Sequence, residues 1–165
     1  MHYKLWYNKN SERKDFMNHY LPSSIMKIAK DLGFRVIEKM PKNDDIACVI
    51  RDENDGVVKF IYINSTLPSP RKRFLVALAL AYYKLDAYEN EKYYKRITLR
   101  DHPDLEIMRK AIHLLLPTPL MVDILRKNKL TEENVPIWAD VLEVEPSVFK
   151  YRVKEITKRR KKNEE

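Results

Sequence analysis

The sequence has few residues of the kinds that mark whole classes of protein. It contains two glycines, Gly33 and Gly56, in 165 residues, which excludes a glycine-rich phosphate loop and a dinucleotide-binding fingerprint. The single cysteine, Cys48, excludes an internal disulfide framework and indicates a reducing compartment. The longest apolar run, from Phe74 to Tyr83, is too short to span a bilayer. Since no N-terminal stretch has the order of a signal peptide, these absences predict a cytoplasmic protein.

The composition is that of a folded protein with an excess of positive charge. Hydrophobic residues make up 44% and charged residues 34% of the chain, a balance that a disordered chain does not have. The formal net charge is +8, with basic residues concentrated between Arg71 and Arg96 and again after Glu145. The run at residues 158–162, KRRKK, fits either the solvated end of a helix or an arm that binds nucleic acid. Charge alone does not decide between these two interpretations.

The hydrophobic pattern predicts an α+β fold in which a helix precedes a small three-stranded antiparallel sheet and further helices follow. Asn54-Asp55-Gly56 indicates a tight hairpin turn between the second and third strands. The last two helices are joined by a link of helix-turn-helix length. We therefore expect a domain over residues 1–128 and a C-terminal helical subdomain with a basic tail over residues 129–165. The predicted elements are helix 11–32 interrupted at Pro22, strands 34–40, 46–51 and 57–64, helices 70–85 and 103–116, a short helix 120–127, and the pair 132–142 and 146–162.

The segment RFLVALALAYYKL, residues 73–85, predicts a helix buried at the centre of the protein, because it is apolar on nearly every face. Ser69 suits the cap of this helix and Pro70 its first turn. The second long helix ends in Leu114-Leu115-Leu116-Pro117, and Asp101 is a candidate cap for its start.

The order of these elements and their motifs resembles the ImmA/IrrE family of zinc metallopeptidase-like proteins. The family's active-site helix begins Arg-Phe-Thr-Leu-Ala-His-Glu-Leu-Gly-His, and Arg73, Phe74, Ala77 and Leu80 match it. Its second block ends Leu-Leu-Met-Pro, which residues 114–117 resemble. The resemblance covers about residues 20–157 and implies a zincin-like arrangement of the two central helices.

The departures from the family motif bear directly on function. A zinc peptidase needs two histidines one helical turn apart, a glutamate beside the first, and a third ligand from a neighbouring helix. Aligned on Arg73-Phe74, the two histidines are replaced by Leu78 and Tyr82 and the glutamate by Ala79. The third ligand falls at Asp104, or at Glu106 if the register slips. The resemblance therefore implies vestigial active-site positions, no catalytic residues, and no bound zinc or other cofactor.

Other sites of chemistry have weaker support in the sequence. His102, Asp104, Glu106 and His113 lie around one helix and are an alternative metal cluster, though ordinary histidines explain them as well. Cys48 is interpreted as a small core residue in a strand. No G-x-S-x-G nucleophile elbow is present. Five tyrosines near lysine and arginine either stack nucleic-acid bases or line the vacated cleft; they are Tyr82, Tyr83, Tyr88, Tyr93 and Tyr94.

Three functions remain open at this point. The leading hypothesis is a catalytically inactive pseudopeptidase of a phage or mobile element that regulates by protein binding, as an antirepressor of a helix-turn-helix repressor. The second is direct DNA binding by the basic C-terminal helix pair. The third is a residual metallopeptidase with unconventional ligands. The residues expected to face phosphates in the second case are Lys150, Arg152, Lys154, Lys158, Arg159 and Arg160.

Overall fold

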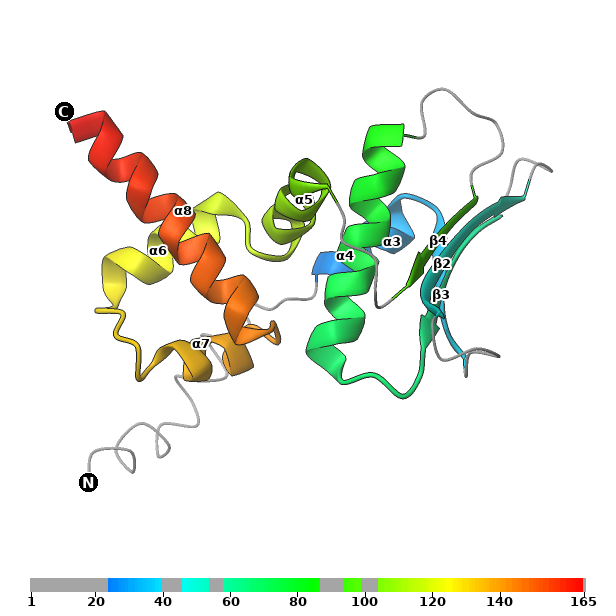
Figure 1. Ribbon diagram of the computed structural model, residues 1–165, viewed down its shortest axis with the longest axis horizontal. Coiled ribbons are helices and arrows are strands. Elements are labelled where there is room, and N and C mark those ends of the chain that lie inside the picture. The colour runs from blue at the N-terminus through cyan, green and yellow to red at the C-terminus, as the bar shows by residue number, and fades with distance from the viewer. Residues whose placement is uncertain (1–23, 40–45, 54–57, 87–93, 99–103, 165) are drawn as a thin grey trace.

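The computed structural model describes residues 24–39, 46–53, 58–86, 94–98 and 104–164. Over these residues the fold is α+β, with helices packed against one face of a single mixed sheet (Figure 1). The elements are α3 (Ser24–Asp31), β1 (Phe34–Lys39), β2 (Ile46–Glu53), β3 (Val58–Asn64), α4 (Ser69–Asp86), β4 (Tyr94–Thr98), α5 (Leu105–Leu115), α6 (Thr118–Lys127), α7 (Val135–Val141) and α8 (Pro146–Glu164).

The sheet differs from the predicted three-stranded antiparallel one in two ways. Its order is β1-β3-β2-β4, with β1 parallel to β3 and the other two pairs antiparallel. The antiparallel pairing of β2 with β3 is as predicted, while the turn at residues 54–56 lies outside the described residues. The fourth strand was missed because Tyr94–Thr98 has five residues of mixed polarity and pairs with β2 alone. The parallel strand was missed because β1 pairs with the second strand after it, which local turn chemistry does not reveal.

Helix α3 forms where the amphipathic pattern places it, in the described part of the predicted helix 11–32. Ile25 and Ala29 are fully buried, and Ile28 and Leu32 pack against the same core. The chain leaves the helix at Gly33, whose φ of +82° is a conformation that glycine adopts without steric cost. The helix therefore buries one face and turns directly into β1.

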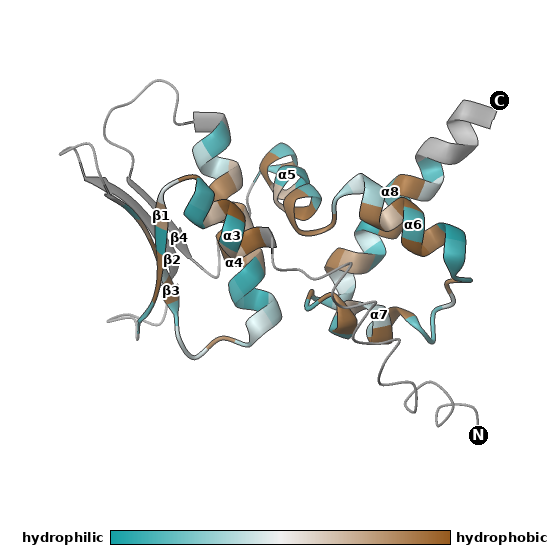
Figure 2. Ribbon diagram, turned by 180° about the vertical axis from the view of Figure 1, so that it is seen from behind, coloured by the Kyte–Doolittle hydropathy of each residue, from teal (hydrophilic) through white to brown (hydrophobic). Residues whose placement is uncertain are grey.

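The central helix α4 lies between the sheet and α5, as Figures 1 and 2 show. Every residue from Arg73 to Tyr82 is buried, so the prediction of a central helix apolar on nearly all sides is confirmed. The inner face of the sheet meets this helix through Ile61 and Ile63 of β3 and Phe34 of β1. Helix α4 therefore packs against the sheet on one side and against α5 on the other.

The C-terminal helices differ from the predicted ones at their ends. Helix α7 begins at Val135 instead of Glu132 because the Asn134 side chain is used to close the preceding loop, accepting from the Thr131 N–H and donating to the Lys129 carbonyl. Helix α6 begins at Thr118, directly after the Pro117 break. Buried side chains from both sides of residue 128 belong to one hydrophobic cluster. The division into two domains at that residue stays a prediction.

Candidate functional site

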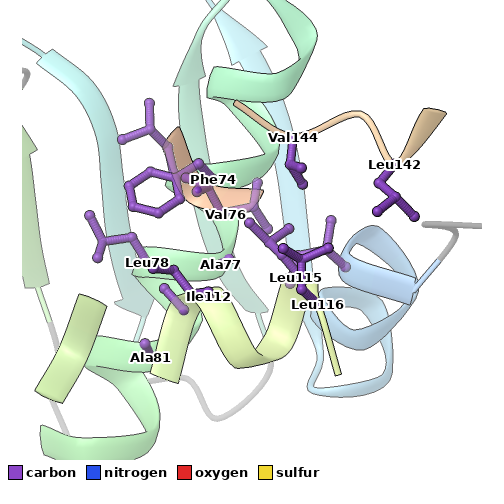
Figure 3. Close-up of a cluster of buried hydrophobic side chains, with 14 of the residues drawn as sticks. Phe74, Val76, Ala77, Leu78, Ala81, Ile112, Leu115, Leu116, Leu142 and Val144 are labelled. Atoms are coloured by element: carbon purple, nitrogen blue, oxygen red, sulfur yellow. The ribbon is translucent and has the colours of Figure 1, made fainter. Parts of the chain in front are cut away.

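The three positions that would hold the zinc-binding motif lie inside the apolar core. Leu78 is 3% exposed, Ala79 0% and Tyr82 7%. Figure 3 shows Leu78 among the buried side chains that α4 shares with α5 and with the turn from Leu142 to Val144. A histidine or glutamate needs a metal or a hydrogen-bonding partner in such surroundings, whereas these apolar side chains do not. The helix is thus held by packing where the family motif uses metal ligands.

Asp104, the candidate third ligand, has a different role in this structure. It is exposed and forms the N-cap of α5, where its Oδ1 accepts a hydrogen bond of 2.7 Å from the backbone N–H of Glu106. The residue expected to cap this helix, Asp101, lies outside the described residues. A carboxylate in this position satisfies one of the free N–H groups at the start of the helix. Asp104 is therefore explained by helix capping alone.

The donor set at this site does not fit a catalytic zinc ion. Leu78 and Ala79 offer no ligand atom, and a phenol and a single exposed carboxylate do not make the three-ligand site that catalytic zinc requires. Within the described part of the chain, no three His, Cys, Asp or Glu side chains are grouped so as to hold a metal ion. The alternative cluster around His113 is likewise not assembled there, and His102 lies outside the described residues.

A buried polar network joins α8 to the corner between α5 and α6. Arg152 is 0% exposed. Its Nε donates to the Leu116 carbonyl at 2.9 Å, Nη2 donates to Thr118 Oγ1 at 2.6 Å, and Nη1 donates to Glu155 Oε2 at 2.5 Å. Leu116 ends α5, and its carbonyl is one that the helix itself leaves without a partner. Arg152 therefore completes the end of α5 and fixes the start of α6.

Glu155 is the anionic centre of this network. Its Oε1 accepts a hydrogen bond from Arg109 Nε at 2.9 Å, and its Oε2 lies 2.8 Å from His113 Nε2. Burial alone would raise the pKa of Glu155, but hydrogen bonds from His113 and Arg152, together with the charges of those groups, outweigh it and lower the pKa to about 2. The carboxylate is thus charged throughout the neutral and mildly acidic range.

This shifted pKa makes the stability of the protein depend on pH in the acidic range. The folded state holds the pKa of Glu155 below its usual value near 4.5. The ionised carboxylate therefore contributes fully to the free energy of unfolding above pH ~4.5, and this contribution is lost as the pH falls towards ~2. A shift of this size corresponds to about 3 kcal/mol. We expect Glu155→Gln to be less stable than wild type at neutral pH, with the difference narrowing as the pH falls to ~3. Urea unfolding of both proteins across this range measures it, and a gap independent of pH would contradict the assignment.

The other residues expected to contact phosphates are distributed along α8. Lys150, Lys154 and Lys158 are exposed, but Lys150 Nζ donates to Glu132 Oε2 at 2.5 Å, and this hydrogen bond is the main cause that lowers the pKa of Glu132. The side chains of Arg159 and Arg160 lie outside the described residues. Arg152 is buried and donates to Leu116, Glu155 and Thr118, so in this structure its guanidinium is not free to contact a phosphate.

A second ion pair ties the first turns of α4 to the turn between α7 and α8. Arg73 is 7% exposed, and its Nη1 donates to Glu143 Oε2 at 3.0 Å. Burial lowers the pKa of Arg73 and the Glu143 carboxylate opposes that effect. Glu143 adopts a positive φ of 49°, and Val144 beside it is 2% exposed. The turn is therefore fixed by both charge and apolar packing against the central helix.

The α+β fold, the buried central helix packed on a second helix and the C-terminal helix pair are the elements that the resemblance to metallopeptidase-like proteins predicts. A family model of the IrrE N-terminal-like domain matches residues 29–154, and the chain therefore belongs to the ImmA/IrrE family, as its motifs suggested. A search of curated proteins gives no match. Among the described residues, no helix has the length and apolar character needed to cross a membrane.

Proposed function

We propose that this ImmA/IrrE family member is catalytically inactive and regulates by binding another protein. The observation that carries the proposal is the burial of Leu78, Ala79 and Tyr82 at the positions of the zinc-binding motif. With these side chains, α4 packs without a metal ion, and the fold is available as a scaffold. Asp104, as an exposed helix cap, adds no support for a remaining metal site.

The partner that we propose is a helix-turn-helix transcriptional repressor of the same phage or mobile element, by resemblance to the family. Binding would relieve repression without cleavage of the repressor. The buried Arg152 weakens the alternative of DNA binding by the helix pair, because it removes one of the six cations counted for that role. An intact protein-binding scaffold is also consistent with the ion pairs that fix the α7–α8 turn on α4.

The proposal predicts derepression with an intact repressor. The purified protein is expected to contain far less than one zinc ion per chain. Its co-expression with a helix-turn-helix repressor of the same phage or mobile element should switch on a reporter while immunoblots show full-length repressor. Zinc content is measured by elemental analysis, and complex formation by co-purification. The control variant is Lys84→Gln, an exposed change on α4, which should have the same zinc content and relieve repression as wild type does. Stoichiometric zinc or a shortened repressor would refute the proposal.

A further inference from the structure

The sheet has one face that no element covers within the described part of the chain. Figures 1 and 2 show α3 and α4 against the inner face only, with the opposite face of the sheet turned outwards. The inner face carries the buried side chains of Phe34, Ile61 and Ile63. Side chains alternate between the two faces along a strand. Phe60 and Tyr62 therefore belong to the outer face, where each is partly exposed.

The strand register brings aromatic and basic residues together on this outer face. Residues directly opposite one another in neighbouring strands share a face. Phe60 lies opposite Arg35 of β1 and Arg51 of β2, and Arg51 lies opposite Tyr94 of β4. In the next row, the residues opposite one another are Ile37, Tyr62, Val49 and Arg96, and Lys39 follows at the end of β1.

The described side chains place two aromatic rings and a lysine close together on this face. The rings of Phe60 and Tyr62 are stacked, with their centroids 5.7 Å apart and an angle of 20° between their planes. The Nζ of Lys39 lies 5.7 Å from the centroid of Tyr62. Arg35 and Lys39 are both exposed. Aromatic faces are thus next to cations whose side chains extend into solvent.

Charge on this face favours a polyanion. On the described strands, the outer register positions hold four cations, Arg35, Lys39, Arg51 and Arg96, against one carboxylate, Glu53, which lies opposite Val58. The whole chain carries a net charge of +8. A protein partner that needs apolar contact would find cations in both rows of this face. The surface instead has the two features that single-stranded nucleic acid needs, namely rings on which bases stack and cations that neutralise phosphates.

We propose that the outer face of the sheet binds single-stranded nucleic acid, with bases stacked on Phe60 and Tyr62 and the backbone held by Arg35 and Lys39. Bases of a duplex are already stacked on one another, so their faces are not available to these rings. The site therefore distinguishes single strands from duplexes more than it distinguishes one base sequence from another. It lies on a different element from the basic helix α8, and it is independent of whether the protein binds a repressor.

Fluorescence anisotropy with the full chain and labelled oligonucleotides of about twelve nucleotides tests the proposal. We expect a single-stranded oligonucleotide to bind, and a duplex of the same length to bind at least about tenfold more weakly. Phe60→Ile with Tyr62→Ile keeps apolar strand-forming side chains but removes the rings, and should weaken binding at least about tenfold. Phe60→Tyr with Tyr62→Phe keeps both rings and should bind nearly as wild type does.

Variants that remove a charge test whether single strands bind at this face of the sheet or at the C-terminal helix pair. Raising the salt concentration from about 50 to about 200 mM should weaken binding, and Arg35→Gln should reduce the slope of log K against log salt by about 0.7. Lys154→Gln with Lys158→Gln, on α8, should leave the affinity for single strands almost unchanged. Loss of binding in that α8 variant, equal affinity for duplex, or no binding at low salt would overturn the proposal. If the isoleucine pair fails to fold by circular dichroism, the Arg35 slope and the ring-exchange variant decide the outcome.

Discussion

Arg152→Met is expected to lower the free energy of unfolding by about 3 to 5 kcal/mol. The side chain is fully buried and donates to the end of α5, to Thr118 and to Glu155. Its removal takes the donor from the Leu116 carbonyl and from the Thr118 hydroxyl, and it takes one cationic partner from the Glu155 carboxylate, which keeps Arg109 and His113. Since domains of this size are stable by about 5–15 kcal/mol, a large part of the stability should be lost. Urea unfolding followed by circular dichroism measures the change.

Two further variants test whether the network, and not merely the loss of a long side chain, causes this effect. Arg152→Lys keeps the charge but cannot reproduce the planar set of donors, so we expect an intermediate loss of stability. Lys154→Met makes a comparable change on the exposed side of the same helix and should alter stability by less than about 0.5 kcal/mol. If Arg152→Met matched Lys154→Met, the role assigned to the buried guanidinium would be wrong.

For Arg152, the helical period in the sequence indicates burial, whereas the charge of the segment suggests contact with phosphates. Val148, Phe149 and Ile156 form the buried stripe of α8. Residue 152 lies three to four positions from each of these, so the helical period already places it on the inner face. The basic character of the segment nevertheless suggested a phosphate contact. The helical period could have predicted the burial of Arg152, but not its partners, because Leu116 and Thr118 come from the corner between α5 and α6.

The sheet shows the same distinction between local and long-range information. The pairing of β2 with β3 follows from two strand-like runs separated by a turn sequence, and it was predicted. The parallel pairing of β1 with β3 joins segments that another strand separates in the sequence. Likewise, β4 reaches β2 from a distant part of the chain. Such pairings depend on which faces must be covered in three dimensions, and this is also why the outer face with Phe60 and Tyr62 was not recognised from sequence.

At the positions of the zinc-binding motif, in contrast, the burial of the side chains could be predicted from the order of residues. The run from Phe74 to Tyr83 is apolar enough to require burial, and the family motif identifies Leu78, Ala79 and Tyr82 as the positions that matter. Asp104 could be placed at the start of the next helix but not given a role. Its capping bond to Glu106 depends on the residue at which α5 begins, and helix ends are the least certain part of any pattern.

Restoring the motif glutamate by Ala79→Glu is expected to destabilise the protein by at least about 3 kcal/mol. Ala79 has no exposed surface, so the new side chain must overpack the core, which costs about 1–3 kcal/mol. It must also either bury an unpaired charge or become protonated, at a further cost. Lys84→Glu, an exposed change to glutamate on the same helix, should have a much smaller effect. The midpoints of urea unfolding compare the two variants directly.

The triple variant Leu78→His, Ala79→Glu and Tyr82→His restores the whole motif. It tests whether these three side chains alone would restore zinc binding, or whether the rest of the metal site is missing as well. A metal that binds the folded state stabilises it by mass action. If α4 now serves only as core packing, zinc should not recover the stability of this triple variant, because Asp104 is exposed and engaged in capping α5. A clear rise in melting temperature with zinc would show that the site needs only its side chains. The absence of such a rise would mean that the third ligand is missing as well, which is expected if Asp104 only caps α5.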